Sequence, residues 1–211
     1  MVLATRNQGK LAELHRILAS VPGLDVELLG LDGFPEVGEI AETGATFADN
    51  ALLKAYAVAH QTGRPAVADD SGLAVDALGG MPGVISARWS GRHGDDEANL
   101  RLVLAQLADV PADRRGAAFV CAAAAVVPGA GERVVEGRLA GVLAREPRGS
   151  NGFGYDPVFV PVGEDRTTAE MSAAEKDAIS HRGIAFRRLA PLLAALLRAP
   201  ATDGEDRLSE R

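Results

Sequence analysis

Residues 66–73 read Ala66-Val67-Ala68-Asp69-Asp70-Ser71-Gly72-Leu73, a short apolar run that ends in two adjacent carboxylates, a hydroxyl and a glycine. A run of this kind, preceded here by Gly63 and Pro65, predicts a strand. Side chains alternate between the faces of a strand, so we expect Asp69 and Asp70 to point in opposite directions. Ligands of open α/β sheets bind at the carboxyl ends of strands, which would place one carboxylate in a crevice. An Asp-Ser-Gly turn after an edge strand is the alternative interpretation.

The composition limits the class of protein. The chain has 211 residues, 47% of them hydrophobic and 24% charged, which suits one globular domain with a sizeable core. We expect this domain, with two lobes, over residues 1–199 and a disordered tail over residues 200–211. Cys121 is the single cysteine and cannot form an internal disulfide. Because the sequence also shows no secretory leader and no 18-residue apolar segment, it predicts a cytoplasmic protein that does not enter a membrane.

The charged residues favour a small anionic ligand. The net charge of −7 argues against a general nucleic-acid binder, which usually carries a basic face. Among the 22 basic residues only Lys10, Lys54 and Lys176 are lysines. A compact ammonium group suits phosphate, so these lysines are candidate phosphate ligands, with chance and codon bias as the alternative.

The N-terminal segment has the arrangement of a phosphate-binding turn. Residues 1–4 predict a short strand, residues 5–10 read Thr5-Arg6-Asn7-Gln8-Gly9-Lys10, and a helix begins near Gly9. Backbone N–H groups converge at a helix N-terminus, the helix dipole attracts anions, and Lys10 adds a positive charge. The GxxxxGK[ST] pattern of a P-loop is absent, so the turn is of another kind.

The middle of the chain predicts further strands and helices. A strand is expected over residues 24–29, followed by an acidic loop that contains Glu42. Thr46 and Asp49 form a capping box for a helix that runs to about Thr62, with Lys54 on its more polar side. The remaining elements are a strand at 73–78, a glycine-rich turn at 79–83, a helix at 95–107, and an antiparallel hairpin of residues 117–127 with residues 133–139.

Residues 148–157 form a glycine-rich stretch with two aromatic residues and an Asp-Pro stop. A rigid loop of this kind can bring its backbone close to a flat ligand. Phe153 or Tyr155 could stack on a base, and Asp156 could accept hydrogen bonds from it. A turn that packs on the core is the alternative.

Two helices are expected near the C-terminus. Ser172 and Glu175 form a second capping box, and Ser180 begins a helix that continues to about residue 198. His181 and Arg182 therefore lie at a helix N-terminus, where positive charge is unfavourable unless an anion is near. Their position indicates a ligand site.

These stretches together resemble the inosine triphosphate-type nucleotide pyrophosphatases, also called dITP/XTP pyrophosphatases. The matching segments are Ala4 to Lys10, Glu42 to Gly44 with Phe47 and Asn50 to Lys54, Ala68 to Leu73, Gly79 to Gly83, Gly152 to Pro157, and Met171 to Gly183. The resemblance implies an elongated α/β protein with two lobes around a long mixed β-sheet with flanking helices. It also implies an active site in the cleft between the lobes, and a homodimer. Arg6 departs from the family pattern, since many members carry a small residue there, and so does Ser150-Asn151, which replaces a more glycine-rich segment.

The resemblance implies a role for each matching residue. Asp70 corresponds to the catalytic acid–base and to a Mg²⁺ ligand, Asp69 to its support, and Glu42 to a further metal ligand. The implied substrate contacts are Thr5, Arg6, Asn7, Gln8, Gly9, Lys10, Lys54, Ser71, Phe153, Gly154, Tyr155, Asp156, Lys176, His181 and Arg182.

The chemistry of these residues agrees with hydrolysis of a nucleoside triphosphate. Mg²⁺ prefers oxygen ligands, and a carboxylate can orient or deprotonate a water whose pKa the metal lowers. No serine–histidine pair or reactive cysteine is evident, so we expect no covalent intermediate. The predicted enzyme converts dITP, ITP and XTP or dXTP to the monophosphate and pyrophosphate, which would clean the nucleotide pool.

Selection would depend on the 6-oxo edge of the purine, read by His181, Arg182 and Asp156. Adenine presents a donor where hypoxanthine presents an acceptor, and an unpaired group in the site costs binding energy. Two alternatives stay open. One is a nucleotide-binding regulator or RNA-associated protein without turnover, and the other is a pyrophosphatase for pyrimidine or modified-base triphosphates.

Overall fold

The computed structural model describes residues 1–19 and 26–199. The predicted tail at 200–211 and the first residues of the strand predicted at 24–29 lie outside these ranges. In the described part of that segment the strand begins later in the sequence and is shorter than expected. Only Leu29–Gly30 pairs in the sheet, as β2. No helix in the described residues is long and apolar enough to cross a membrane.

One mixed sheet of six strands runs through the described chain in the order β2-β1-β3-β4-β5-β6. β2, β1 and β3 are parallel, and β3, β4, β5 and β6 pair antiparallel. The strands other than β2 are β1 (Val2–Leu3), β3 (Ala66–Val75), β4 (Gly116–Val127), β5 (Gly131–Leu143) and β6 (Phe159–Pro161). The predicted hairpin is confirmed, and β5 is longer at both ends than expected.

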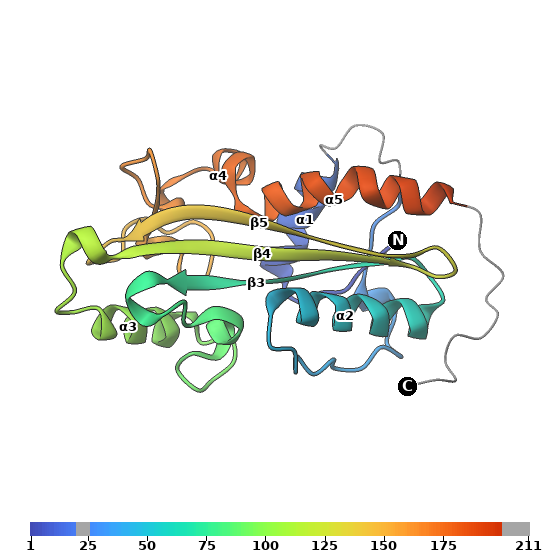
Figure 1. Ribbon diagram of the computed structural model, residues 1–211, viewed down its shortest axis with the longest axis horizontal. Coiled ribbons are helices and arrows are strands. Elements are labelled where there is room, and N and C mark those ends of the chain that lie inside the picture. The colour runs from blue at the N-terminus through green and yellow to red at the C-terminus, as the bar shows by residue number, and fades with distance from the viewer. Residues whose placement is uncertain (20–25, 200–211) are drawn as a thin grey trace.

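Five helices flank this sheet within the described residues. They are α1 (Gln8–Ala19), α2 (Phe47–Thr62), α3 (Asp96–Gln106), α4 (Ala173–Ile179) and α5 (His181–Arg198). The capping boxes predicted at Thr46 and Ser172 are both formed. Figure 1 shows β4 and β5 running along the molecule, with α1, α2 and α5 around one end and α3 and α4 toward the other. The elongated α/β architecture is therefore confirmed.

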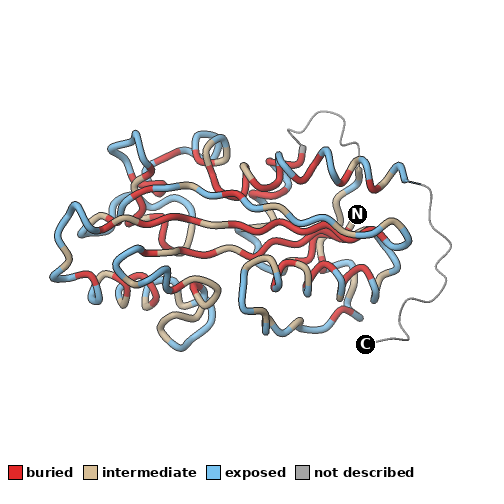
Figure 2. The backbone as a smooth tube through the Cα atoms, viewed as in Figure 1, coloured by how far each residue is buried: buried red, intermediate tan, exposed pale blue. Residues whose placement is uncertain are grey.

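The core consists of three apolar clusters set by the alternation of strand side chains. Helices α1 and α5 pack on odd-numbered positions such as Val67 and Ala123, while α2 packs on even-numbered positions such as Ala68 and Ala122. The third cluster joins α3 to the far end of the sheet around Phe119. The alanines of β4 are small, so helices on both faces can approach the sheet closely. Figure 2 shows the resulting band of buried residues along the central strands.

The prediction that a strand ends at Asp69 and Asp70 is wrong. β3 continues without a break from Ala66 to Val75, so residues 73–75 of the strand predicted separately at 73–78 belong to it, and Asp76–Leu78 form a short 3-10 helix instead. Asp69 to Gly72 pair in register with Ala123 to Val120 of β4, and this distant partner keeps the polar residues in the strand. The parallel neighbour β1 pairs only with Ala66 and Val67. The two carboxylates thus lie just beyond the point where β1 ends.

Candidate active site

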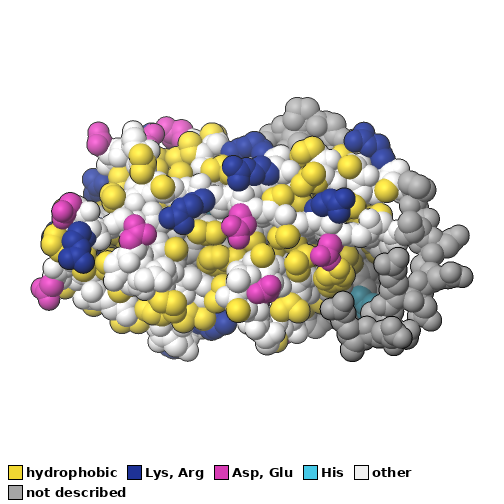
Figure 3. Space-filling view, in the orientation of Figure 1, with side chains coloured by type: hydrophobic (Ala, Val, Ile, Leu, Met, Phe, Trp, Pro, Cys, Tyr) yellow, Lys and Arg dark blue, Asp and Glu magenta, His cyan; other side chains and the backbone are white. Residues whose placement is uncertain are grey.

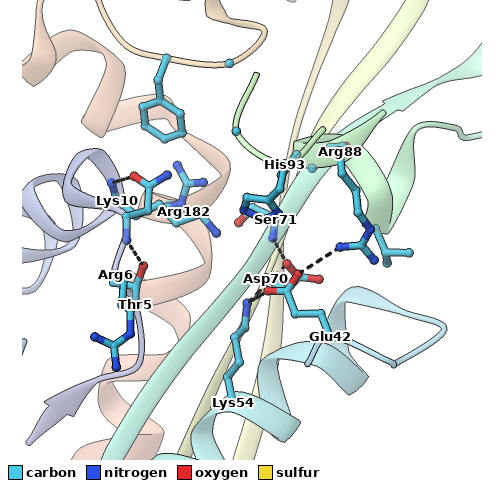
Figure 4. Close-up of a pocket in the computed structure, with 18 of the residues that line it drawn as sticks. Thr5, Arg6, Lys10, Glu42, Lys54, Asp70, Ser71, Arg88, His93 and Arg182 are labelled. Carbon is cyan, nitrogen blue, oxygen red and sulfur yellow. Dashed lines mark hydrogen bonds and ion pairs between the residues drawn. The ribbon is translucent and has the colours of Figure 1, made fainter. Parts of the chain in front are cut away.

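A cleft of about 400 Å³ opens where β1 ends beside β3. Its walls come from the turn after β1, the loop at residues 38–42, α2, β3, the turn at residues 84–88, the segment at residues 153–156, α4 and α5. Figure 4 shows Lys10 and Arg182 on one side of this cleft and Lys54, Glu42 and Arg88 on the other. Segments from both ends of the sequence therefore form one site.

Most of the residues predicted for the site line this cleft. They are Thr5, Arg6, Asn7, Lys10, Glu42, Lys54, Asp70, Ser71, Phe153, Gly154, Tyr155, Asp156, Lys176, His181 and Arg182. Gln8, Gly9 and Asp69 do not line it. All three lysines of the chain do, as their rarity in the sequence suggested.

One side of the cleft centres on Lys54. Its ammonium group lies 2.6 Å from Glu42 Oε1 and 3.5 Å from Asp70 Oδ1. The expectation that Lys54 occupies a polar face of α2 is wrong, because the residue is buried between these carboxylates. Burial alone would lower the pKa of Lys54, but the negative charges of Asp70, Asp69 and Glu42 outweigh it and raise this pKa. Lys54 is therefore a fixed positive charge.

The two carboxyl groups beside Lys54 have pKa values that shift in opposite directions. Burial raises the pKa of Asp70, opposed by Lys54 and reinforced by the charge of Glu42. Burial would also raise the pKa of Glu42, but Lys54 outweighs it and lowers this pKa. A carboxylate with a raised pKa is a better proton acceptor, which is the property required of a general base.

Asn50 of α2 fixes the orientation of Asp70. The Asn50 Nδ2 group donates to Asp70 Oδ2 at 3.0 Å, and Asn50 Oδ1 accepts from the Gly44 backbone N–H at 2.7 Å. Gly44 has no room for a side chain, since a Cβ there would lie 2.5 Å from the Asp49 Cβ. The turn after Glu42 is thereby tied to the carboxylate of Asp70 through one buried amide.

Asp69 points to the opposite face of β3, as predicted, and lies behind the cleft wall. Its Oδ2 atom accepts from Ser71 Oγ at 2.7 Å and lies 3.2 Å from Lys10 Nζ and 3.1 Å from Arg182 Nε. Burial would raise the pKa of Asp69, but Lys10, Arg182 and Lys54 hold it well below its ordinary value. Asp69 is thus a permanent anion that joins α1, β3 and α5.

The turn after β1 is held in shape by its own side chains. Asn7 Oδ1 accepts from the Lys10 backbone N–H at 3.0 Å, and Thr5 Oγ1 accepts from the Asn7 N–H at 3.2 Å. Arg6 donates to the Val37 carbonyl and so ties the turn to the next loop. A Cβ on Gly9 would lie 3.1 Å from the Phe153 ring, so glycine lets the two walls approach each other.

The aromatic segment opposite this turn contains Phe153 and Tyr155, and the two rings have different surroundings. Tyr155 is buried, and its hydroxyl donates to the Ser86 carbonyl at 2.9 Å. Phe153 is half-buried, with Lys176 Nζ 5.0 Å and the Arg182 guanidinium carbon 5.3 Å from its ring centroid. Phe153 is therefore the more exposed of the two rings.

Asp156 is engaged by the protein itself. Asp156 Oδ2 accepts from the Phe153 N–H at 2.9 Å and from Lys176 Nζ at 2.5 Å, and Asp156 Oδ1 accepts from Thr168 Oγ1 at 2.8 Å. This carboxylate orders the backbone beside Phe153 and places Lys176 at the cleft wall.

His181 lies at the floor of the cleft at the start of α5. Its ring stacks on Phe119, with centroids 4.9 Å apart and an interplanar angle of 19°. Burial and the positive charges of Arg182 and Lys176 lower the pKa of His181 well below its ordinary value, so the imidazole is neutral at pH 7. Its Nδ1 atom is buried and has no hydrogen-bond partner in the described residues. A neutral imidazole can both donate and accept hydrogen bonds.

The oxygen ligands of the cleft fit a hard divalent cation. Asp70 and Glu42 supply carboxylate oxygens on the two sides of Lys54. The described ranges contain no group of three or more histidines, cysteines, aspartates or glutamates that could hold a metal ion by themselves. Mg²⁺ is often bound by one or two carboxylates together with substrate phosphates. The site therefore fits a cation that binds with a phosphate ligand.

Sequence reasoning missed three residues of the site. Arg88 lines the cleft 3.8 Å from Glu42 Oε2, Asn50 holds Asp70, and Glu13 of α1 lies 2.7 Å from Arg182 Nη1. Arg88 could have been predicted from its position after the glycine-rich turn. Glu13 could have been predicted as a charged residue one helical turn after Lys10, beside the apolar Leu14.

The fold and the cleft define a class: an α/β protein with carboxylates and fixed cations in one cleft, an arrangement that suits a phosphorylated ligand. The sequence profile of the Ham1 family matches residues 1–192, and the chain belongs to this family.

Named relatives cover nearly the whole chain. A protein from Frankia alni called dITP/XTP pyrophosphatase is 65% identical over 202 residues, which are 93% of this chain and 98% of that protein. A protein of the same name from Streptomyces avermitilis is 62% identical over 197 residues, again 93% and 98%.

Solved structures of similar proteins agree with these sequence matches. A nucleoside-triphosphatase and dITP/XTP pyrophosphatase from Mycobacterium abscessus has a TM-score of 0.72 and 61% identity, covering 91% of this chain and 97% of that one. The Ham1 protein of Staphylococcus aureus has a TM-score of 0.81 and 38% identity, covering 92% and 97%. The resemblance found in the sequence is therefore confirmed.

Proposed function

We propose that this protein hydrolyses deaminated purine nucleoside triphosphates, namely dITP, ITP and XTP or dXTP, to the monophosphate and pyrophosphate. The observation that carries the proposal is the cluster of the buried Asp70 and Lys54 with the half-buried Glu42, which faces Lys10 and Arg182 across one cleft. The named relatives from Frankia and Streptomyces support the same activity.

The phosphate end of the substrate would lie between Lys10, Lys54 and Arg88. These cations come from different elements and neutralise the charge of a triphosphate from several directions. The backbone N–H groups at the start of α1 add donors and a favourable helix dipole. Fixed charges of this kind stabilise developing charge on the phosphates without reorganisation.

Asp70 would act as the general base. Asn50 and the Ser71 N–H hold its carboxylate, the latter donating to Oδ1 at 3.1 Å, and its raised pKa favours acceptance of a proton from the attacking water. Asp70 and Glu42 would hold Mg²⁺, which lowers the pKa of water and neutralises phosphate charge when it is bound. Asp69 supports this arrangement from the other face of β3.

The base end of the substrate would lie against Phe153, His181 and Arg182. Phe153 offers a stacking face, and the neutral imidazole and the guanidinium offer hydrogen-bond donors to the 6-oxo group. Asp156 would contribute by placing Phe153 and Lys176, because both of its oxygens are already in use. Adenine presents an amino group at position 6 and would leave these donors unpaired.

The proposal also includes the cellular compartment, the oligomeric state and the kind of partner. The buried Cys121 thiol, whose pKa burial raises to about 12, suits a reducing cytoplasm. A homodimer follows from the resemblance, and light scattering of the purified protein would test it. Figure 3 shows basic and acidic side chains interspersed on one face, and with the net charge of −7 this supports a small-molecule substrate over nucleic acid.

The test is a comparison of substrates. Purified protein with Mg²⁺ is incubated with dITP, XTP, dGTP, dATP and dUTP, and the phosphate product is identified. Pyrophosphate, released faster from dITP and XTP than from the others, is the expected result. Release of single orthophosphate would overturn the bond assignment. An equal or greater rate on dUTP would reassign the substrate, and tight binding without turnover would favour a regulator.

A further inference from the structure

Two carboxylates of the cleft have no cationic partner. Three of the five acidic side chains that line it pair with lysines, and these are Glu42, Asp70 and Asp156. The other two, Glu39 and Asp96, form no ion pair within the described part of the chain. Of these two, Asp96 is the one that a hydrogen bond holds in place. Asp96 is therefore an unpaired carboxylate with a defined orientation.

Asp96 is the first residue of α3, and its side chain reaches the segment that carries Phe153. Asp96 Oδ2 accepts from the Gly154 backbone N–H at 2.8 Å. Asp96 Oδ1 forms no hydrogen bond with the residues that the structure describes. Since an ionised carboxylate accepts hydrogen bonds on both oxygens, Asp96 offers one oriented acceptor to a ligand in the cleft.

The loop that joins Arg88 to α3 is held by one buried side chain. Asn99 of α3 is 1% exposed, and its Oδ1 atom accepts from the Ser90 N–H at 2.7 Å. Asn99 Nδ2 donates to the Ala87 carbonyl at 3.1 Å, and the Gly94 N–H donates to the same carbonyl at 2.8 Å. The start of α3 therefore has a fixed position relative to Arg88.

Asp96 connects the wall assigned to the phosphates with the wall assigned to the base. The loop from Arg88 leads to it on one side, and on the other side its carboxylate binds the N–H of the residue after Phe153. Figure 4 shows His93 of this loop and Arg88 on the same side of Ser71. In a nucleotide the sugar lies between the phosphates and the base. A negative charge beside the phosphates would repel them, whereas sugar hydroxyl groups can donate hydrogen bonds to it.

We propose that Asp96 recognises the sugar of the substrate, with Oδ1 accepting a hydrogen bond from the 3′ hydroxyl group. The proposal rests on the proposed function, because the order of phosphates, sugar and base in the cleft comes from it. Ribose and deoxyribose both carry this hydroxyl, so the contact serves dITP and ITP alike. A carboxylate binds a ribose hydroxyl in the same manner in dinucleotide-binding folds.

A role of Asp96 in the cation site is disfavoured by the geometry. The described residues contain no group of three or more acidic, histidine or cysteine side chains that could hold a metal ion. Asp96 is thus not a third protein ligand beside Asp70 and Glu42.

The alternative is that Asp96 only holds the aromatic segment in place through Gly154. A structural role of this kind predicts that loss of the carboxylate lowers the turnover of every nucleotide by the same factor. A sugar contact predicts a loss that is confined to nucleotides with a 3′ hydroxyl group. The ratio of kcat/KM for dITP to kcat/KM for 2′,3′-dideoxy-ITP separates the two roles.

The test measures this ratio in the wild type, in Asp96→Ala, in Asp96→Asn and in the control Glu97→Gln. Glu97 is the next residue of α3, its side chain is 73% exposed, and it does not line the cleft. Calorimetric binding of 2′-deoxyinosine monophosphate and of its 2′,3′-dideoxy form is measured in parallel. Circular dichroism and thermal denaturation check that each variant is folded.

The wild type should prefer dITP to 2′,3′-dideoxy-ITP by about tenfold or more, because a charge-assisted hydrogen bond is lost with the hydroxyl group. In Asp96→Ala the ratio should fall to within about twofold of unity. Asp96→Asn keeps the shape and an oxygen for the Gly154 N–H but loses the charge, so its ratio should lie between these values. This variant decides the question if Asp96→Ala does not fold. Glu97→Gln should keep the wild-type ratio.

A wild-type ratio near unity would overturn the sugar contact, and so would a wild-type ratio that persists in both Asp96 variants. If no nucleotide released pyrophosphate, the proposed function would fail by itself. The comparison of the two monophosphates needs no turnover and would still decide the role of Asp96. If dUTP were the better substrate, dUTP and its 2′,3′-dideoxy form would give the same ratio, because the contact does not depend on the base.

Discussion

The ammonium group of Lys54 lies 3.5 Å from Asp70 Oδ1, and its second carboxylate partner is Glu42, at 2.6 Å. One buried cation therefore lies between the two carboxylates that we assign to metal binding. Lys54 offsets the repulsion between these two negative charges. The contribution of the Asp70 charge can be tested by substitution of this residue.

Replacement of Asp70 by Asn should abolish turnover while the protein stays folded. The amide has the same shape but cannot accept the proton of water, and a general base contributes about 10²- to 10⁴-fold to rate. Turnover of dITP is measured together with the thermal midpoint and nucleotide binding. Activity within about tenfold of the wild type would reject Asp70 as the general base.

The Gly44→Ala variant should lower kcat by displacing Asn50. The added Cβ would lie 2.7 Å from Asn50 Oδ1, so the amide that orients Asp70 must move. Gly33→Ala is the matched control, since a Cβ at Gly33 has nothing within 4 Å. Steady-state kinetics and thermal denaturation of both variants are the measurements. Equal kcat in the two variants would show that the link from Gly44 through Asn50 does not matter for the reaction.

Arg88→Gln should reduce kcat/KM for dITP by roughly tenfold or more, because a charge-assisted contact to a phosphate is lost. Arg92→Gln is the control in the same segment. The Arg92 side chain is 85% exposed and does not line the cleft, so its loss should have little effect. Inhibition by pyrophosphate should weaken only in Arg88→Gln. Comparable kinetics in both variants would remove Arg88 from the phosphate site.

Stability should fall with acid through His181. Its pKa in the folded protein is lowered, so the folded state keeps it neutral while the unfolded chain takes up a proton below about pH 6.5. The stabilising contribution is therefore complete above that pH and is lost as pH falls, at most by about 1.4 kcal/mol per pH unit.

Chemical denaturation at several pH values between 7.5 and 5.5 measures this loss. His181→Gln should make the free energy of unfolding less dependent on pH in that range. His60→Gln, at an exposed position, should keep the wild-type slope. The comparison uses slopes, because the buried substitution also changes stability at every pH. Parallel slopes in all three proteins would show that His181 takes up a proton equally in the folded and unfolded states, so that folding does not lower its pKa.

Much of the fold was predictable because its signals are local. The capping boxes at Thr46 and Ser172, the hairpin of β4 and β5, and the turn before Lys10 are each encoded within a few neighbouring residues. The scarcity of lysine also pointed to the cleft, because each lysine provides a compact charge there. Residue type and local position were sufficient for these features.

What could not be predicted depends on partners far away in the sequence. β3 continues through two aspartates because β4 pairs with them, and no local pattern shows this pairing. The Glu13 and Arg182 pair spans 169 positions. Asn50 resembles any polar residue in a helix until the fold places it against Asp70. These contacts require the tertiary structure.

Asp69 and Asp70 are consecutive residues of a continuous strand, and this has a geometric consequence. The carboxylate that holds Arg182, which we propose contacts the base, and the carboxylate that we assign to the reacting water are separated by one peptide unit, about 3.8 Å between Cα atoms. The spacing between recognition and chemistry is thus set by covalent bonds instead of by the packing of separate elements. A shift of β3 by a single residue would exchange the two carboxylates between faces, so any misregistered form would lose both halves of the site together.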